Sequence, residues 1–170
     1  GTFGVSLNPT QGEPLCDEAD TWTGIRTVTA DSTHGLRVNG RSLKLKGGCI
    51  HHDNGLLGAV SLYDSEYRKL KLLKDARFNA VRLAHNPPSR ELLEACDRIG
   101  LYVFDEAFDA WGFSKQAGDY SQFFEDHWKE DMEAFIIRDR NHPPVLFWST
   151  GNEVEERGGM GNGYAIAEKL

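Results

Sequence analysis

Short apolar runs alternate with amphipathic stretches along most of the chain. The apolar runs have the length of buried strands, and the amphipathic stretches repeat their apolar residues every three or four positions, as helices do. We predict four strands, over residues 43–47, 80–83, 101–104 and 145–148. We predict three helices between them, over residues 65–77, 89–99 and 121–140. Apolar strands separated by helices indicate a parallel sheet with helices packed on it.

This order of elements fits either a doubly wound sheet or part of a (β/α)8 barrel. A nucleotide-binding doubly wound sheet carries a glycine-rich phosphate turn after its first strand. Here Gly47-Gly48-Cys49 runs into His51 and His52 instead of opening a helix. This argues against a nucleotide-binding sheet, and we predict an α/β fold, either another doubly wound sheet or a partial (β/α)8 TIM barrel. If the fold is a barrel, which takes about 250 residues when complete, this chain holds only the first four strands.

The N-terminal stretch has a different pattern. Trp22–Thr29 alternates and is rich in β-branched residues, which predicts a strand. Asn39-Gly40 lies between alternating apolar residues and predicts a hairpin over residues 36–45. We expect residues 1–34 to be the end of a preceding β-sandwich domain and a linker, and residues 35–170 to be the N-terminal half of the barrel.

Composition narrows the class of protein. The 170 residues are 39% hydrophobic and 26% charged, with a formal net charge of −7, as in an ordinary globular domain. Lys and Arg form no basic stripe, so we expect no nucleic-acid partner. No apolar run approaches the roughly 20 residues that span a bilayer, so no membrane partner is expected. The three cysteines are widely spaced, which favours reduced thiols over disulfides or a structural zinc site.

The cellular compartment is left open by the sequence. No signal peptide is visible, and a cytoplasmic location is slightly favoured. The chain begins at Gly1 without Met, which suggests that the natural N-terminus lies upstream.

Polar side chains gather where each predicted strand ends. In a barrel, such positions meet at the C-terminal rim, where active sites lie. The residues concerned are His51, His52 and Asp53, then Arg82, His85 and Asn86, then Asp105, Glu106, Asp109 and Trp111, and finally Asn152 and Glu153. Four strands that each deliver titratable groups to one rim predict a functional site there.

Each of these residues also has a structural interpretation. Arg82 can form an ion pair with Glu106 on the next strand, and a single histidine can be an ordinary loop residue. A metal-dependent hydrolase is a rival interpretation, although no His-x-His or His-Glu-x-x-His spacing is present. Neither Ser149 nor Cys49 lies in a nucleophile elbow. Glu153 follows an apolar strand and a glycine and sits beside Asn152, so for Glu153 we favour a function.

Four runs, in order, resemble motifs of glycoside hydrolase family 2, which contains β-galactosidases, β-glucuronidases and β-mannosidases. Arg138–Glu153 resembles the acid/base signature of that family. The others, which resemble its first three barrel strands, are Asn39-Gly40 with Lys46-Gly47 and His51, then Phe78–Pro87, then Cys96–Ala107. The resemblance extends over residues 24–158. It also implies that the residues before Asp31 are the last strand of an immunoglobulin-like domain.

The resemblance implies roles for individual residues. Glu153 would be the general acid/base and Asn152 would bind the 2-hydroxyl of the sugar. We expect the other substrate-contacting residues at the rim to be His85, His51, Arg82, Asp105 and Trp111. Arg82 would also help to position the nucleophile. Trp111 would offer a stacking face to a sugar or, equally, pack in the core.

The chemistry is that of a retaining β-glycosidase. Protonation of a glycosidic oxygen near neutral pH requires a carboxylic acid whose pKa is raised by its surroundings. A second carboxylate attacks the anomeric carbon. No motif for that nucleophile occurs in the 170 residues, so we expect it outside this chain and expect the isolated chain to be inactive. The Glu-x-His magnesium motif of some relatives is replaced by Phe108–Gly112, and we expect no metal and no cofactor.

The expected substrate is a terminal, non-reducing β-linked sugar. A β-galactosidase is favoured, with a β-glucuronidase or β-mannosidase as the alternative. A non-catalytic carbohydrate-binding fragment is the alternative from a different class. The expected partners are a carbohydrate, the other half of the barrel and the β-sandwich domains of the parent chain, and a homo-oligomer is left open.

Overall fold

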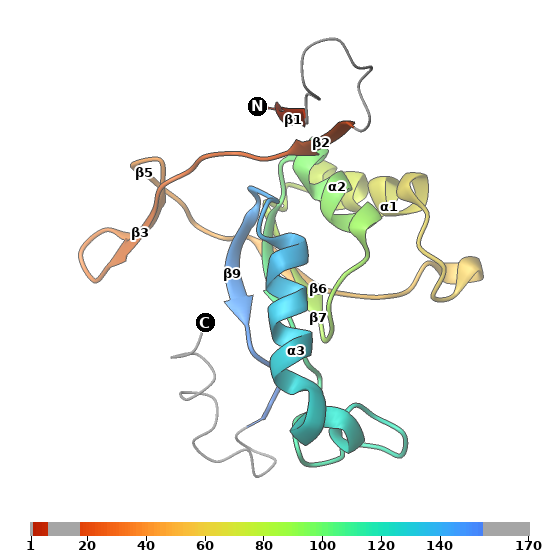
Figure 1. Ribbon diagram of the computed structural model, residues 1–170. Coiled ribbons are helices and arrows are strands. Elements are labelled where there is room, and N and C mark those ends of the chain that lie inside the picture. Colours follow the sequence, from red (N-terminus) through yellow and green to blue (C-terminus); the bar gives the residue numbers. More distant parts are fainter. Residues whose placement is uncertain (1, 7–17, 155–170) are drawn as a thin grey trace, which may run out of the picture.

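A computed structural model describes the backbone of residues 2–6 and 18–154, with side chains from residue 23 onward (Figure 1). Its strands are β1 (Thr2–Ser6), β2 (Glu18–Trp22), β3 (Val28–Asp31), β4 (Gly35–Val38), β5 (Arg41–Ser42), β6 (Gly47–His51), β7 (Ala80–Ala84), β8 (Tyr102–Glu106) and β9 (Val145–Ser149). Its helices are the single 3-10 turn η1 (Gly55–Leu57) and the α-helices α1 (Tyr63–Asp75), α2 (Arg90–Ile99) and α3 (Ser121–Asp139).

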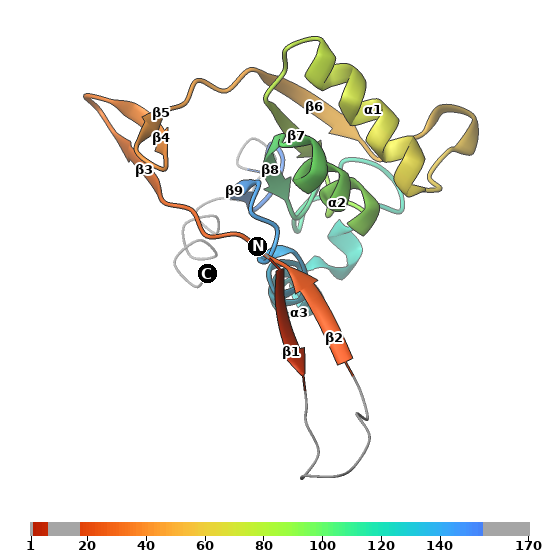
Figure 2. The same ribbon diagram turned by 90° about the horizontal axis from the view of Figure 1, so that it is seen from above.

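The main sheet is parallel, with strand order β6-β7-β8-β9. A helix connects each strand of this sheet to the next one. Figure 2 shows α1 and α2 together on one side of the sheet. Side chains of the helices and of the outward strand positions form the core between these layers, for example Leu70, Leu93, Val81 and Val103. The predicted α/β fold with a parallel sheet is confirmed.

The helices α2 and α3 have the predicted bounds to within one residue, and α2 has the predicted end. The Ser89 hydroxyl accepts the Leu92 N–H and caps the start of α2. Gly100 has a φ of 74° and ends the helix in the left-handed conformation that glycine adopts without strain. In α3, Phe124, Met132 and Phe135 are buried on the predicted apolar stripe.

Two predicted elements are displaced in the structure. The first barrel strand is Gly47–His51 and not 43–47, because residues 47–51 pair in parallel with Ala80–Ala84 while 43–46 stay outside the sheet. The alternation of Leu and Lys over 43–46 suggested a strand, whereas the real strand begins with two glycines. A Cβ on Gly47 would lie 2.5 Å from the Ala80 carbonyl oxygen, so the close approach of β6 and β7 requires glycine there.

Helix α1 starts two residues earlier than predicted, and Ser65 does not cap it. Leu62 occupies the capping position and makes no side-chain cap hydrogen bond. The Ser65 hydroxyl instead donates to Oδ1 of Asn54, 3.0 Å away in the preceding loop. The helix is therefore tied at its start by the loop and not by a capping serine.

A three-stranded antiparallel sheet, β3-β4-β5, precedes the barrel strands. Asn39 and Gly40 both have positive φ, as the predicted two-residue hairpin turn requires. The predicted strand over 22–29 is wrong, because β2 ends at Trp22 and β3 begins at Val28. Since β3 pairs with β4, this sheet spans the predicted boundary between residues 34 and 35. Both predicted domain ranges include residues outside the described part, so the division stays a prediction.

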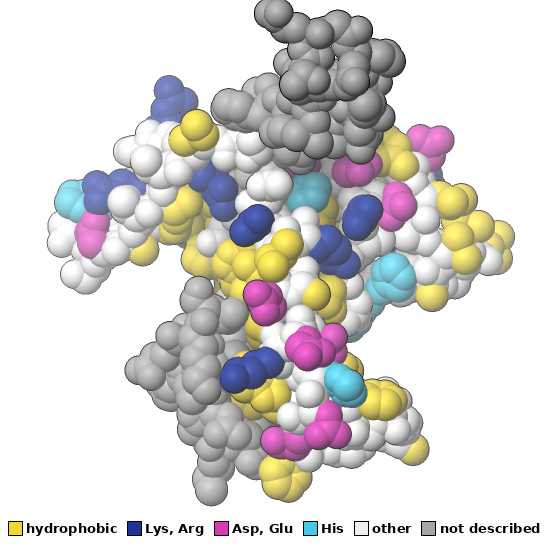
Figure 3. Space-filling model, viewed as in Figure 1, with side chains coloured by type: hydrophobic (Ala, Val, Ile, Leu, Met, Phe, Trp, Pro, Cys, Tyr) yellow, Lys and Arg dark blue, Asp and Glu magenta, His cyan; other side chains and the backbone are white. Residues whose placement is uncertain are grey.

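The loop between β6 and α1 projects from the sheet. Leu56, Val60 and Leu62 are exposed in it, and Figure 3 shows hydrophobic side chains on the surface of this part of the molecule. The inner face of the sheet is apolar near its base, where the rings of Phe104 and Phe147 stack with their centroids 4.7 Å apart. Among the described residues, no helix covers that inner face (Figure 2).

Candidate active site

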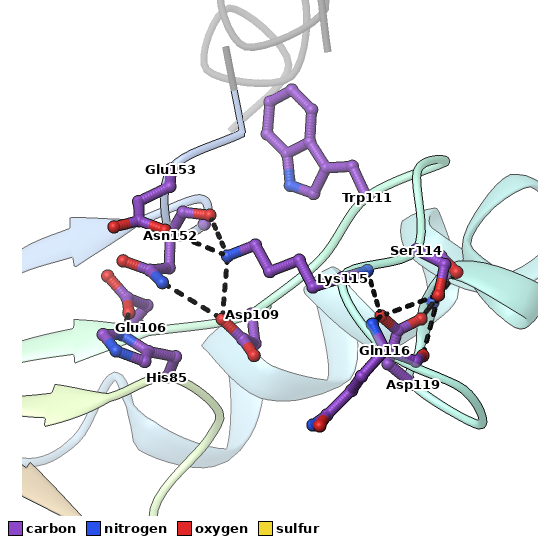
Figure 4. Close-up of polar contacts among 12 residues, drawn as sticks. His85, Glu106, Asp109, Trp111, Ser114, Lys115, Gln116, Asp119, Asn152 and Glu153 are labelled. Atoms are coloured by element: carbon purple, nitrogen blue, oxygen red, sulfur yellow. Dashed lines mark hydrogen bonds and ion pairs between the residues drawn. The ribbon is translucent and has the colours of Figure 1, made fainter. Parts of the chain in front are cut away.

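The carboxyl ends of the four parallel strands bring most of the predicted residues together. His51 is the last residue of β6, Arg82 lies within β7, and His85 follows that strand directly. Glu106 ends β8, and Asn152 lies three residues after β9. Figure 4 shows side chains from three of these strand ends pointing toward one another. The rim expected from the sequence is therefore present.

Glu106 is the centre of this rim and is fully buried. Its carboxylate accepts hydrogen bonds from the Nε and Nη2 of Arg82 at 3.0 and 2.6 Å and from the Ser149 hydroxyl at 2.7 Å. Nδ1 of His85 lies 2.7 Å from Oε1 of Glu106. Since an ionised carboxylate only accepts, we assign the hydrogen of this contact to Nδ1. The predicted ion pair between Arg82 and Glu106 is confirmed.

Asn152 is oriented from both ends of its amide. Its Oδ1 accepts from Nη2 of Arg82 at 3.1 Å, and its Nδ2 donates to Oδ1 of Asp109 at 3.1 Å. Its backbone N–H donates to the Phe108 carbonyl at 3.0 Å. Gly151 precedes it, where a Cβ would lie 2.7 Å from Nε1 of Trp111. The turn after β9 is thus packed too closely for a larger residue at that position.

Glu153 projects from this turn with its side chain 56% exposed. Its backbone has a φ of 52°, in the left-handed region that non-glycine residues seldom adopt. Nζ of Lys115 lies 3.9 Å from Oε2 of Glu153. A carboxyl group in this position is accessible to a substrate and has a cation beside it.

Asp109 and Lys115 complete the polar network. Nζ of Lys115 donates to Oδ1 of Asp109 at 2.9 Å and to the Asn152 carbonyl oxygen at 2.7 Å. Burial acts to raise the pKa of Asp109, but the hydrogen bonds from Lys115 and Asn152 outweigh it and hold that pKa below its usual range. Asp109 is therefore a carboxylate. Lys115 was not identified from the sequence, because a lysine in the irregular segment before α3 has no distinguishing pattern.

A cavity of about 560 Å³ opens beside the two predicted sugar-binding histidines, His51 and His85, whose rings meet edge to face at 5.2 Å. Apolar walls from Phe108 and Phe135 and polar groups such as Asp109 line it. This size and this mixture are typical of small-molecule sites.

Asp105 does not contribute to the rim, contrary to the prediction. Side chains alternate across a strand, so Asp105 points away from Glu106 and is fully buried. Among the described residues, neither of its carboxylate oxygens has a hydrogen-bond partner that meets normal geometry. Burial, and after it the charge of Asp139, raises the pKa of Asp105 to about 8. A substrate cannot reach this group.

The raised pKa of Asp105 predicts a pH-dependent stability. Between the unfolded pKa near 4 and the folded pKa of about 8 the native state holds a proton that the unfolded state releases, so stability falls as pH rises. Asp105→Asn in the full-length protein should flatten this dependence and raise the free energy of unfolding at pH 8 by at least about 1 kcal/mol. Urea unfolding at pH 5 and pH 8 measures it. An equal change at both pH values would contradict the assignment.

Trp111 is a core residue and offers no stacking face to a sugar. It is 3% exposed, its ring stacks on Phe124 with centroids 5.6 Å apart, and its indole N–H donates to the Thr150 carbonyl at 3.0 Å. Of the two roles considered for this residue, the structure supports packing. Trp111 therefore holds the turn after β9 from the core side.

The described residues contain no group of three or more His, Cys, Asp or Glu side chains placed to hold a metal ion. In the same part of the chain, no helix is long and apolar enough to cross a membrane.

Comparison with known proteins gives a consistent result. A family model, "Glycosyl hydrolases family 2, TIM barrel domain", matches residues 30–169. Beta-galactosidase BoGH2A of Bacteroides ovatus is 46% identical over 147 residues, which are 86% of this chain and 17% of that protein. A solved family 2 member from Bacteroides cellulosilyticus matches with a TM-score of 0.89 at 47% identity, covering 99% of this chain and 21% of that one.

A β-glucuronidase from Ruminococcus gnavus, solved with C6-substituted uronic isofagomine, matches with a TM-score of 0.79 at 27% identity, covering 99% of this chain and 29% of that one. The chain spans less than a third of the length of each of these relatives. Four parallel strands, a polar rim at their carboxyl ends and a family match over residues 30–169 agree: the chain belongs to the TIM barrel domain of glycosyl hydrolase family 2.

Proposed function

We propose that this chain is the acid/base-bearing part of a retaining β-glycosidase that releases terminal β-linked sugars. The observation that carries the proposal is the exposed carboxyl group of Glu153 next to Asn152, whose amide is fixed by Arg82 and Asp109. A general acid must reach the glycosidic oxygen, and a sugar-binding amide beside it must not rotate. The turn after β9 meets both requirements.

In this mechanism, Glu153 gives its proton to the glycosidic oxygen as the bond from that oxygen to the anomeric carbon breaks. A second carboxylate forms a bond to the same carbon from the opposite side. Glu153 then takes a proton from water, and the resulting hydroxide displaces the second carboxylate. Asn152 would hold the 2-hydroxyl, while His85 and His51 would contact the sugar from the cavity wall.

The second carboxylate is assigned to a glutamate outside these 170 residues, on a later barrel strand. Glu106 and Asp109 are poor nucleophiles, because hydrogen bonds already hold both oxygens of Glu106 and Oδ1 of Asp109. Glu106 is buried under Arg82, His85 and Ser149, and Asp109 is bound by Lys115 and Asn152. Arg82 reaches the rim from β7 and would help to orient the incoming carboxylate. The other barrel strands, and β-sandwich domains before residue 35, are the proposed partners within the parent chain.

For the sugar, we propose a β-galactoside. The similarity to a protein named as a β-galactosidase, at 46% identity, supports this choice. The match to a β-glucuronidase at 27% identity keeps a β-glucuronide as the alternative, and a β-mannoside is the other substrate of the same family.

The test is turnover of aryl β-galactoside, glucuronide, mannoside and glucoside by the full-length protein. We expect turnover of one sugar well above the others, and NMR of the first-formed product should show the β-anomer. An α-anomer as first product would refute retention. If the protein binds a sugar but turns over none of these glycosides, it is a carbohydrate-binding module and not an enzyme.

A further inference from the structure

We infer that Lys115 is a positioning residue for the proton transfer, one that fixes the Asn152–Glu153 turn through a closed ring of hydrogen bonds. This inference rests on the proposed function. In the ring, Nζ of Lys115 and Nδ2 of Asn152 both donate to Oδ1 of Asp109, at 2.9 and 3.1 Å. Nζ of Lys115 also donates to the Asn152 backbone carbonyl, at 2.7 Å, and so closes the ring (Figure 4).

The ring acts on the peptide bond that carries Glu153. The carbonyl group of Asn152 belongs to the same planar unit as the Glu153 N–H, so a hydrogen bond to that oxygen restricts rotation at the start of Glu153. The left-handed φ of 52° at Glu153 is costly for a residue other than glycine and persists only when its surroundings enforce it. Lys115 contributes to that constraint through the Asn152 carbonyl, and its ammonium group lies 3.9 Å from Oε2 of Glu153.

Lys115 is itself held in place. Its side chain is only 12% exposed, and its backbone N–H donates to Oδ2 of Asp119 at 2.6 Å. The same oxygen accepts from the backbone N–H of Gln116 at 3.0 Å and from the hydroxyl of Ser114 at 3.2 Å. Hydrogen bonds, first from the Ser121 hydroxyl and then from the Gln116 N–H, hold the pKa of Asp119 well below its usual range. An ionised Asp119 therefore anchors the turn from which Lys115 reaches Asn152.

A positioning role in proton transfer has a specific kinetic result. A poor leaving group, such as methoxyphenoxide, departs only when the acid protonates it, whereas dinitrophenoxide departs without a proton. We expect Lys115→Met to lower kcat/KM for the methoxyphenyl glycoside by about 10²-fold, because a displacement of about 1 Å has an effect of that size. For the dinitrophenyl glycoside of the same sugar, kcat/KM should fall less than about 3-fold.

The experiment compares both glycosides, with the sugar chosen from the substrate panel, in the full-length protein. Lys129→Met makes the same change on an exposed position of α3 and should leave both rates unchanged. If Lys115→Met folds poorly, Lys115→Cys treated with bromoethylamine restores an ammonium group on a side chain of similar length. This treatment should recover the methoxyphenyl rate. The unchanged enzyme treated in the same way is the control, since Cys49 is exposed and reacts as well.

Equal losses with both leaving groups, or no loss with either, would overturn the inference. A treated Lys115→Cys enzyme that stays as slow as the untreated one would also overturn it. These outcomes are separate from failure of the proposed function, in which no aryl glycoside is turned over or Glu153→Gln is as fast as the unchanged enzyme. If Glu153→Gln loses turnover and Lys115→Met does not, the proposed function stands and only the role of Lys115 is refuted.

Discussion

Glu153→Gln in the full-length protein is expected to lower turnover of a poor-leaving-group aryl glycoside by about 10²- to 10⁴-fold, the range that general acid/base groups contribute. Glutamine has the same shape but can neither give nor take the proton. The Glu153 side chain is mostly exposed, and its ion pair with Lys115 is long, at 3.9 Å. Its replacement should therefore leave the melting temperature of the protein unchanged. Steady-state kinetics with thermal unfolding measures both quantities.

The matched control is Glu94→Gln, the same change at an exposed position of α2, which should alter neither quantity. Azide, a small nucleophile that needs no general base, should restore part of the turnover of an activated glycoside by Glu153→Gln and yield a glycosyl azide. A variant as fast as the unchanged enzyme would remove Glu153 from the mechanism and move the search to other rim acids.

Arg82→Met is expected to lower the free energy of unfolding by about 3–5 kcal/mol, as for other buried ion pairs that lose one partner. Glu106 is fully buried, and Arg82 provides three of its close contacts, at 3.0, 2.8 and 2.6 Å. Methionine has a similar apolar stem, so the loss comes from an unpaired buried carboxylate and not from a cavity. Denaturant unfolding of the full-length protein measures the change.

A double-mutant cycle tests this explanation. Adding Glu106→Gln to Arg82→Met removes the unpaired charge, so the double variant should be more stable than Arg82→Met alone. The hydrogen bonds from His85 and Ser149 to this side chain are retained in part by an amide. If the double variant is no more stable, the destabilisation arises from lost packing of the arginine stem, and the ion pair is not its cause.

The sequence predicted the parts of the fold that repeat a simple pattern. Strands β7 and β9 lie within one residue of the predicted runs, and α2 has both of its end signals, whereas β8 extends two residues beyond its predicted end. Strand β6 was misplaced because parallel pairing with β7 selects Gly47 and Gly48, which have low strand propensity. The position of β6 is therefore set by its tertiary contacts and not by its local sequence pattern.

The sequence predicted that polar residues would meet at the rim, but it did not predict which of their side chains point into the site. Asp105 and Glu106 are adjacent, and only the exact extent of β8 decides which one faces inward. The predicted strand ended at Phe104, so both acids were expected beyond it. Lys115 is placed by the Asp119 turn, a set of backbone hydrogen bonds that no residue spacing in this segment indicates.

The left-handed backbone at Glu153 has a consequence for protein engineering. At most sites, glycine lowers the free energy of unfolding more than alanine does, because it gives the unfolded chain more conformational freedom. At position 153, however, glycine fits the φ of 52° without strain and alanine does not. A variant without the acid could transfer a sugar from a donor that has an activated leaving group to an added thiol. Such a variant is therefore better built with Glu153→Gly than with Glu153→Ala. The natural backbone already has the conformation that the smaller residue prefers.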